Sequence, residues 1–165
     1  MKVGQIMTRE VRVCTQSDSL NRAAQLMWDN DCGCVPVISA NGDGSLIGML
    51  TDRDICMAAY TEGKQLLEIP VATAMAKTVI SCRPGDDIRR VEALMKKNQI
   101  RRIAVVDERG ALQGIVSIND LACEAERETA AKAGIEITEA EIGETLAAVC
   151  RHRSGKIFDR RTPSV

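Results

Sequence analysis

An internal duplication constrains the fold of this chain more than any other feature of its sequence. A shift of 68 residues brings the first part of the chain onto the second, with matched pairs that include Val3 and Val71, Met7 and Met75, Cys14 and Cys82, and Val37 and Val105. The shift becomes 66 residues after N-G-D-G at 41–44, which aligns with the shorter E-R-G at 108–110, and it then holds to Asp54 and Asp120. A register interrupted only at a predicted turn indicates two copies of a unit that cannot bury its apolar face alone.

Each copy has the pattern of a mixed α/β (α+β) unit in the order β-α-β-β-α. Apolar residues at helical spacing alternate with short segments rich in β-branched residues, and polar turns separate the paired strands. The expected elements of the first and second copy are extended segments at 11–14 and 79–82, helices capped by Asp18 or Ser19 and by Asp86, strands at 35–38 and 102–106, strands at 45–50 and 111–116, and helices at 52–60 and 118–131.

These elements predict the domain organisation. We expect a first repeat at 1–60, a linker at 61–70, a second repeat at 71–128, a helical extension at 129–150 and a basic tail at 151–165. The extension contains Thr138 and Glu141 at the spacing of a capping box. The tail, R-H-R-S-G-K-I-F-D-R-R-T-P-S-V, is expected to be exposed and mobile.

The composition narrows the classes of function. Hydrophobic residues make up 45% of the chain and charged residues 27%, with a net charge of -1, which is typical of a globular protein without a field that attracts nucleic acid. Aromatic residues make up 2%, too few for a base-stacking surface. The chain shows neither a secretory signal nor an apolar run long enough to cross a membrane, so we expect it in the cytoplasm with its seven cysteines reduced.

The sequences G-M-L-T-D-R-D at 48–54 and G-I-V-S-I-N-D at 114–120 share one motif at equivalent points of the repeats. Thr51 and Ser117 fall where a strand meets a helix, beside backbone N-H groups that favour a phosphate. Asp54 and Asp120 lie one helical turn further on, where a carboxylate can accept hydrogen bonds from ribose hydroxyls. The alternative interpretation is a capping box, which has the same [ST]-x-x-[DE] spacing and needs no ligand.

The duplicated β-α-β-β-α order, the V-P-V-I strand and the repeated G-h-h-[ST]-x-x-D motif, where h is apolar, together resemble the CBS domain family over about residues 1–128. The resemblance implies a pair of repeats related by pseudo-twofold symmetry, in the stand-alone type of Bateman module. It implies a non-catalytic regulatory protein that requires no cofactor, forms a homodimer and relays adenine-nucleotide binding to an unknown target protein. The resemblance also implies two clefts between the repeats, which in this family bind AMP, ADP, ATP, NAD or S-adenosylmethionine.

The motifs and the strands beside them define the expected ligand-binding residues. They are Thr15, Val35, Pro36, Gly48, Thr51, Arg53 and Asp54 in the first repeat, and Cys82, Arg102, Ile103, Gly114, Ser117, Asn119 and Asp120 in the second. One departure from the family pattern is Ala104, which stands where the first repeat has Pro36.

Two other functions remain open at the level of the sequence. One is a dimerising scaffold with vestigial clefts, whose helix at 139–150 binds a partner; the other is a thiol-based redox sensor at Cys32 and Cys34. Paired zinc ligands and a nucleophile beside a histidine are both missing from the sequence, so we expect neither a metal site nor an enzyme. Trp28 is interpreted as a packing residue of its helix, which includes packing at a dimer contact, in preference to a platform for a ligand.

Overall fold

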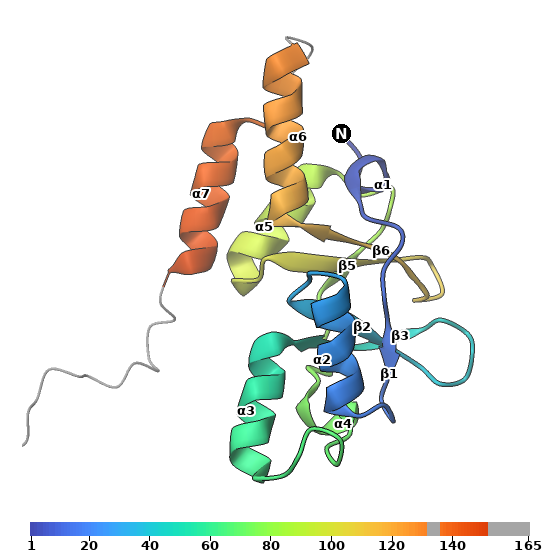
Figure 1. Cartoon of the computed structure of the whole chain (residues 1–165). Helices are drawn as coiled ribbons and strands as arrows, with labels where there is room; N and C mark the ends of the chain where they lie inside the picture. The colour runs from blue at the N-terminus through green and yellow to red at the C-terminus, as the bar shows by residue number, and fades with distance from the viewer. Residues whose placement is uncertain (132–135, 152–165) are drawn as a thin grey trace, which may run out of the picture.

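The structure, a computed structural model, describes residues 1–131 and 136–151, so most of the predicted basic tail lies outside the described residues. The six strands form two three-stranded sheets that correspond to the two repeats (Figure 1). The first sheet contains β1 (Cys14–Thr15), β2 (Cys34–Ile38) and β3 (Leu46–Thr51), and the second contains β4 (Ser81–Cys82), β5 (Arg102–Val106) and β6 (Leu112–Ser117). The helices are α1 (Val3–Ile6), α2 (Leu20–Asp29), α3 (Asp52–Glu62), α4 (Val71–Ala74), α5 (Ile88–Asn98), α6 (Ile118–Ala131) and α7 (Glu139–Cys150).

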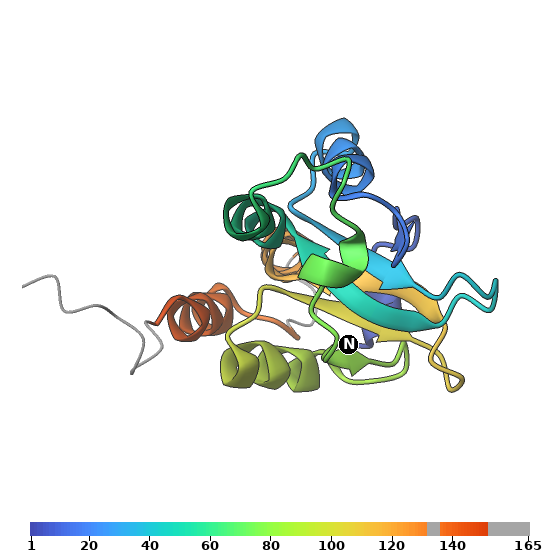
Figure 2. The same cartoon turned by 90° about the horizontal axis from the view of Figure 1, so that it is seen from below.

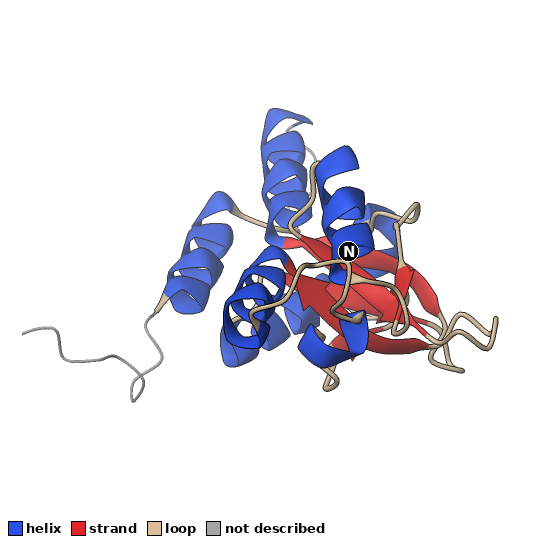
Figure 3. Ribbon diagram, turned by 60° about the horizontal axis from the view of Figure 1, so that its bottom comes forward, coloured by secondary structure: helices blue, strands red, loops and turns tan. Residues whose placement is uncertain are grey.

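The predicted fold class, two mixed α/β repeats, is confirmed. In each sheet the central strand pairs parallel with the short first strand and antiparallel with the third. The strands lie together in the interior with helices around them (Figure 3), and the β2–β3 and β5–β6 turns project on the same side (Figure 2).

Three details of the predicted elements need correction. The first strand, expected at 11–14, is β1 at Cys14–Thr15. A one-turn helix, α1 or α4, precedes each β-α-β-β-α unit; four residues are too short for a helical period to show in the sequence. The N-cap of α5 is Asp87, whose side chain accepts a hydrogen bond from Arg89 N, whereas Asp86 accepts one from Arg83 N in the preceding turn. Ser19 caps α2.

The start of each sequence repeat packs on the other repeat. Thr8 exchanges two backbone hydrogen bonds of 2.9 Å with Ile115 on β6, and Ala76 exchanges bonds of 2.8 and 3.0 Å with Met49 on β3. Val3 is fully buried in the second hydrophobic core, and Val71 in the first. We call residues 3–8 and 71–76 the exchanged segments, because each packs on the repeat to which it does not belong by sequence. They cover the edges of β3 and β6 and connect the two repeats.

The C-terminal helix α7 breaks the pseudo-symmetry. It packs on α5 and α6 of the second repeat, and both views place it beside them (Figures 1 and 2). Its Thr145 is fully buried against α5. Within the described part of the chain, no helix combines the length and apolar character that a membrane crossing requires.

Candidate functional site

The repeated motif forms the same structure twice. The Thr51 hydroxyl donates to Asp54 Oδ2 at 2.7 Å and accepts from Asp54 N at 3.2 Å, while Thr51 N donates to Asp54 Oδ2 at 2.9 Å. In the second repeat the corresponding distances between Ser117 and Asp120 are 2.7, 3.3 and 2.7 Å. Both pairs are therefore capping boxes at a strand-to-helix junction, and all four residues are partly buried.

The capping bonds leave hydrogen-bond acceptors at each junction. Asp54 and Asp120 use only Oδ2, and Oδ1 has no donor among the described residues. Each hydroxyl proton is used within its pair, so only a lone pair of the hydroxyl oxygen is left. An acceptor pair of this kind fits the two hydroxyls of a vicinal diol, such as a ribose, and does not fit a phosphate.

The expected backbone donors for a phosphate are already engaged at the start of α3. Asp52 N donates to Gly33 O at 3.2 Å, Arg53 N to Asp52 Oδ1 at 2.7 Å, and Asp54 N to Thr51 Oγ1. The helix α6 shows the same feature at Ile118 N, which donates to Arg101 O at 2.9 Å. The prediction of free N-H groups was therefore wrong at the start of α3, where the strand end and the cap satisfy them. At α6, Ile118 N and Asp120 N are engaged in the same way.

The two motif glycines face the exchanged segments. A Cβ atom on Gly114 would lie 2.6 Å from the backbone oxygen of Thr8, and one on Gly48 would lie 2.8 Å from Met75 Sδ and 3.2 Å from Ala76 O. Each glycine is needed because another part of the chain crosses it closely. The sequence predicted a close approach at these positions, and the chain itself makes it.

Pro36 changes the pairing beside the first junction. In the second repeat β4 pairs from Ser81 with Ala104, but in the first repeat β1 pairs only from Cys14 with Val37, one residue later in the aligned sequence. Proline has no N-H to donate to a neighbouring strand, so Val13 cannot pair as Ser81 does. The change from proline to alanine thus moves the second ladder one residue toward the start of its strands, while each ladder keeps two residue pairs.

One cation reaches across the repeats to the first junction. The Nη2 atom of Arg102 lies 3.9 Å from the position of a Cβ on Gly33, and Asp52 Oδ2 lies 3.1 Å from the same position. On its own strand Arg102 pairs with Ser117, as Cys34 pairs with Thr51. Arg102 is partly buried and forms no ion pair with any described residue. The approach of Gly33 and Asp52 to Arg102 was missed, since the contact joins different repeats.

The model of the CBS domain matches residues 3–60 and 70–125, a span that contains both junctions. The chain belongs to the CBS-domain family. A CBS domain-containing protein of Bacillus subtilis, YhcV, is 35% identical over 116 residues, which are 70% of this chain and 79% of the relative.

Solved CBS-domain structures share the fold of the pair. The CBS domain protein TA0289 of Thermoplasma acidophilum superposes with a TM-score of 0.73 at 25% identity, over 90% of this chain and 75% of that one. CBSX2, solved in complex with AMP, superposes with a TM-score of 0.68 at 25% identity, over 78% of this chain and 98% of that one.

The CBS pair separates its expected ligand-binding residues into two groups. Half-buried residues at the junctions are Thr51, Asp54, Arg102, Ser117 and Asp120, with Arg53 and Asn119 exposed beside them. The half-buried Thr15 is not brought to the first junction, because it pairs with Ile38 at the other end of β2 from Cys34 and Thr51. Buried residues are Val35, Pro36, Gly48, Cys82, Ile103 and Gly114, of which Val35, Cys82 and Ile103 belong to the hydrophobic cores. Thr15 also closes a turn, because its N and Oγ1 both donate to Asp18 Oδ2.

The cysteines give little support to a redox site. All seven are free thiols. Burial raises the pKa of the Cys34 thiol, against the opposing effect of Arg102, and burial raises the pKa of Cys14 and of Cys82 to about 11. A raised pKa keeps a thiol protonated and unreactive. No cluster of three or more metal-ligating side chains occurs within residues 1–131 and 136–151.

Proposed function

We propose that this CBS pair is a non-catalytic regulatory module that binds an adenine nucleotide, such as AMP, ADP, ATP, NAD or S-adenosylmethionine, at one or both junctions. The observation that carries the proposal is the pair of identical Thr/Ser-Asp junctions, each with a free carboxylate oxygen and a hydroxyl lone pair. The ribose hydroxyls would donate to these oxygens. The AMP complex of a structural relative supports this class of ligand.

The first junction is the stronger candidate. Its ladder begins one residue later than the second, and the unpaired guanidinium of Arg102 lies beside it. A phosphate or carboxylate of the ligand would pair with Arg102, with Arg53 at the rim. Because Arg102 comes from the other repeat, a bound ligand would bridge the repeats. Differential affinity for two arrangements of the repeats would then change the surface that a target protein meets.

We place this function in the cytosol, because seven cysteines without a disulfide suit a reducing compartment. Catalysis has no part in the proposal. Each junction offers acceptors that can bind and orient a nucleotide, the first also has the Arg102 cation beside it, and neither offers an activated nucleophile.

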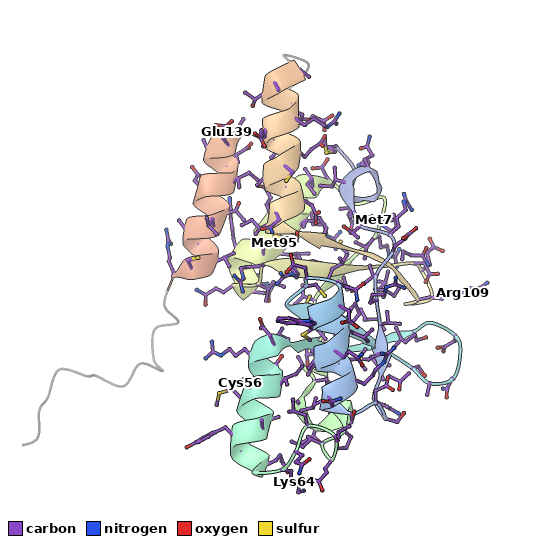
Figure 4. All side chains as sticks on the ribbon, in the orientation of Figure 1. Met7, Cys56, Lys64, Met95, Arg109 and Glu139 are labelled. Carbon is purple, nitrogen blue, oxygen red and sulfur yellow. The ribbon has the colours of Figure 1, made fainter. Side chains whose placement is uncertain are left out.

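Calorimetric titration with AMP, ADP, ATP, NAD and S-adenosylmethionine tests the proposal. We expect Asp54→Ala to weaken binding of the preferred nucleotide by about tenfold, since the ribose hydrogen bond to the charged carboxylate is lost. Asp120→Ala should have a similar effect only if the second junction also binds. Arg102→Gln should weaken the binding of nucleotides that carry a phosphate. Arg109→Gln, at the tip of the β5–β6 turn (Figure 4), should leave their binding unchanged.

A third capping box supplies the control for stability. Glu141 accepts from Thr138 N and Thr138 Oγ1, both at 2.9 Å, far from either junction. Glu141→Ala and Asp54→Ala should each cost about 1 kcal/mol of stability through the lost cap, but only Asp54→Ala should change nucleotide affinity. If none of the nucleotides binds the wild-type protein at millimolar concentration, the junctions are caps only and the proposal fails.

A further inference from the structure

The helices α2 and α3 of the first repeat border an apolar hollow that the described part of the chain leaves open. It has a volume of about 500 Å³ and is lined by Ala24, Met27, Trp28, Ile55 and Cys56, with Asp31, Cys32, Gly33 and Asp52 completing its wall. Trp28 is 85% exposed, so the prediction of a packing residue is not met within the described residues. Figure 4 shows Cys56 directed away from the body of the molecule.

The rim of this hollow is acidic. Asp31 and Asp52 line it, and neither forms an ion pair with a described residue. Asp52 Oδ1 accepts from Arg53 N at 2.7 Å, while Oδ2 lies beside Gly33. An occupant that suits the hollow therefore combines an apolar group with cations next to it.

The equivalent face of the second repeat is already covered by the C-terminal region of the chain. Helix α7 packs across both α5 and α6, and no described helix spans α2 and α3 in that way. That contact includes Lys96 Nζ at 4.0 Å from Glu144 Oε2. The 68-residue register places Trp28 where α5 has Lys96, so an acidic helix like α7 would find no cation here. The first repeat calls for an occupant of the opposite charge.

The chain beyond α7 has this chemistry. Residues 152–165, which lie outside the described residues, read H-R-S-G-K-I-F-D-R-R-T-P-S-V. The segment carries four cations against one aspartate, namely Arg153, Lys156, Arg160 and Arg161 against Asp159. These cations flank the apolar pair Ile157-Phe158. An apolar pair between cations is complementary to an apolar hollow with an acidic rim.

The segment also starts close to the hollow. Gln99 Nε2 donates to Arg151 O at 2.7 Å, and Gln99 stands three residues before Arg102. Arg102 Nη2 lies 3.9 Å from the position of a Cβ on Gly33, in the wall of the hollow. Figures 1 and 2 both show this end of α7 on the α3 side of the molecule. Three residues of chain cover at most about 11 Å, and the six from Arg151 to Ile157 cover about 20 Å, so Ile157 can reach the hollow.

We propose that the segment 152–165 binds the hollow of its own chain, with Ile157-Phe158 against Trp28 and the flanking cations beside Asp31 and Asp52. The C-terminal region then covers both repeats, the second with α7 and the first with this segment. A short tether gives an effective concentration on the order of millimolar, so a contact of modest intrinsic affinity forms within one chain. This inference does not depend on nucleotide binding.

Fluorescence of Trp28, the only tryptophan of the chain, tests the proposal in the full-length protein. The double substitution Ile157→Ser and Phe158→Ser should shift the emission to longer wavelength and raise quenching by acrylamide, because the indole loses its cover. Val165→Ser removes another apolar side chain of the segment and should change neither quantity. Circular dichroism confirms that each variant is folded.

The charged part of the contact is tested separately. Asp31→Asn should shift the emission in the same direction as the double variant, and so should salt at about 1 M, which screens exposed charges. Asparagine suits the left-handed backbone of Asp31, whose φ is 47°, so the substitution does not strain the turn.

Rescue by a peptide separates occupation of the hollow from folding. A synthetic peptide of residues 152–165, at millimolar concentration, should return the emission of the double variant toward that of the wild type. The same peptide with serine at positions 157 and 158 should have no effect.

Disulfide trapping locates the contact. In Phe158→Cys, mild oxidation should join the thiol at position 158 to Cys56 of the same chain, which is exposed in the hollow. A disulfide to Cys123 or Cys150 in place of Cys56 would overturn the proposal. So would a wild-type emission identical to that of the double variant. An emission that changes with protein concentration would also overturn it, because a second copy would then fill the hollow.

Discussion

At the scale of single residues, the motif glycines show how one position can serve the fold inside a candidate ligand-binding motif. Gly48 and Gly114 are conformationally ordinary, and they are needed only because a second chain segment passes within contact distance. The same motif holds Asp54 and Asp120, whose free oxygens carry the proposed ribose contacts. Substitutions at the glycines and at the aspartates should therefore separate folding from binding.

We expect Gly114→Ala to destabilise the protein more than Gly48→Ala does. The new methyl group would lie 2.6 Å from the backbone oxygen of Thr8, which cannot move without breaking the bonds to Ile115, whereas the nearest atom at Gly48 is the flexible end of Met75. Overpacking of this kind costs about 1–3 kcal/mol. Urea denaturation measures the difference, and Gly85→Ala, with nothing within 4 Å, is the neutral control. Equal losses at both glycines would contradict the explanation.

At the scale of elements, the docking of α7 on α5 buries one carboxyl group. Glu92 is 6% exposed, and burial raises its pKa above the ordinary value of 4.5, against the opposing effect of Lys96. The Thr145 hydroxyl lies 2.8 Å from Glu141 O and 3.3 Å from Glu92 Oε1 and has one proton, which suits the shorter contact. A protonated Glu92 can donate to the Thr145 oxygen and so complete the network.

The pH dependence of stability follows from this pKa. The folded state binds more protons at Glu92 than the unfolded state, so the contribution is fully present below pH 4.5 and is lost as pH rises through the folded pKa. Glu92→Gln keeps the neutral form at every pH. We expect its free energy of unfolding to exceed that of the wild type increasingly above pH 4.5.

Denaturant titrations over this range measure that difference. The other charged groups facing Glu92, namely Arg89, Lys96 and Glu141, are common to both proteins and largely cancel in the comparison. A difference that does not change with pH would show that Glu92 is ionised beneath α7.

At the scale of the whole molecule, the exchanged segments make the two repeats depend on each other. Val3 belongs to the first repeat by sequence but lies in the core with Val91 and Leu121, and Val71 lies in the core with Leu20 and Leu50. A unit cut at the boundaries of the sequence repeat would lack part of its own core. Ligand-induced movement of one repeat would reach the other through these segments.

Hydrogen exchange tests whether the core of each repeat depends on a segment of the other repeat. Val71→Ala should cost about 2 kcal/mol and should reduce protection mainly in β2 and β3, which lie in the repeat that does not contain residue 71 by sequence. Val3→Ala is the matched reverse case and should act mainly on β5 and β6. Loss of protection confined to each residue's own sequence repeat would contradict the exchange.

The sequence by itself determined the duplication, the strands and long helices of each repeat, and the paired Thr/Ser-Asp motif, because hydrophobic period and capping spacing are local properties of the chain. Local pattern could not show that the hydroxyls of Thr51 and Ser117 donate their protons to the aspartate of the same motif. It also could not show that Arg102 reaches Gly33 from the other repeat. Only the tertiary structure decided which segments cross the glycines, which repeat α7 covers, and that Trp28 faces solvent. These outcomes depend on contacts between residues distant in the chain, and neither the 68-residue nor the 66-residue register encodes how two copies of a unit pack on each other.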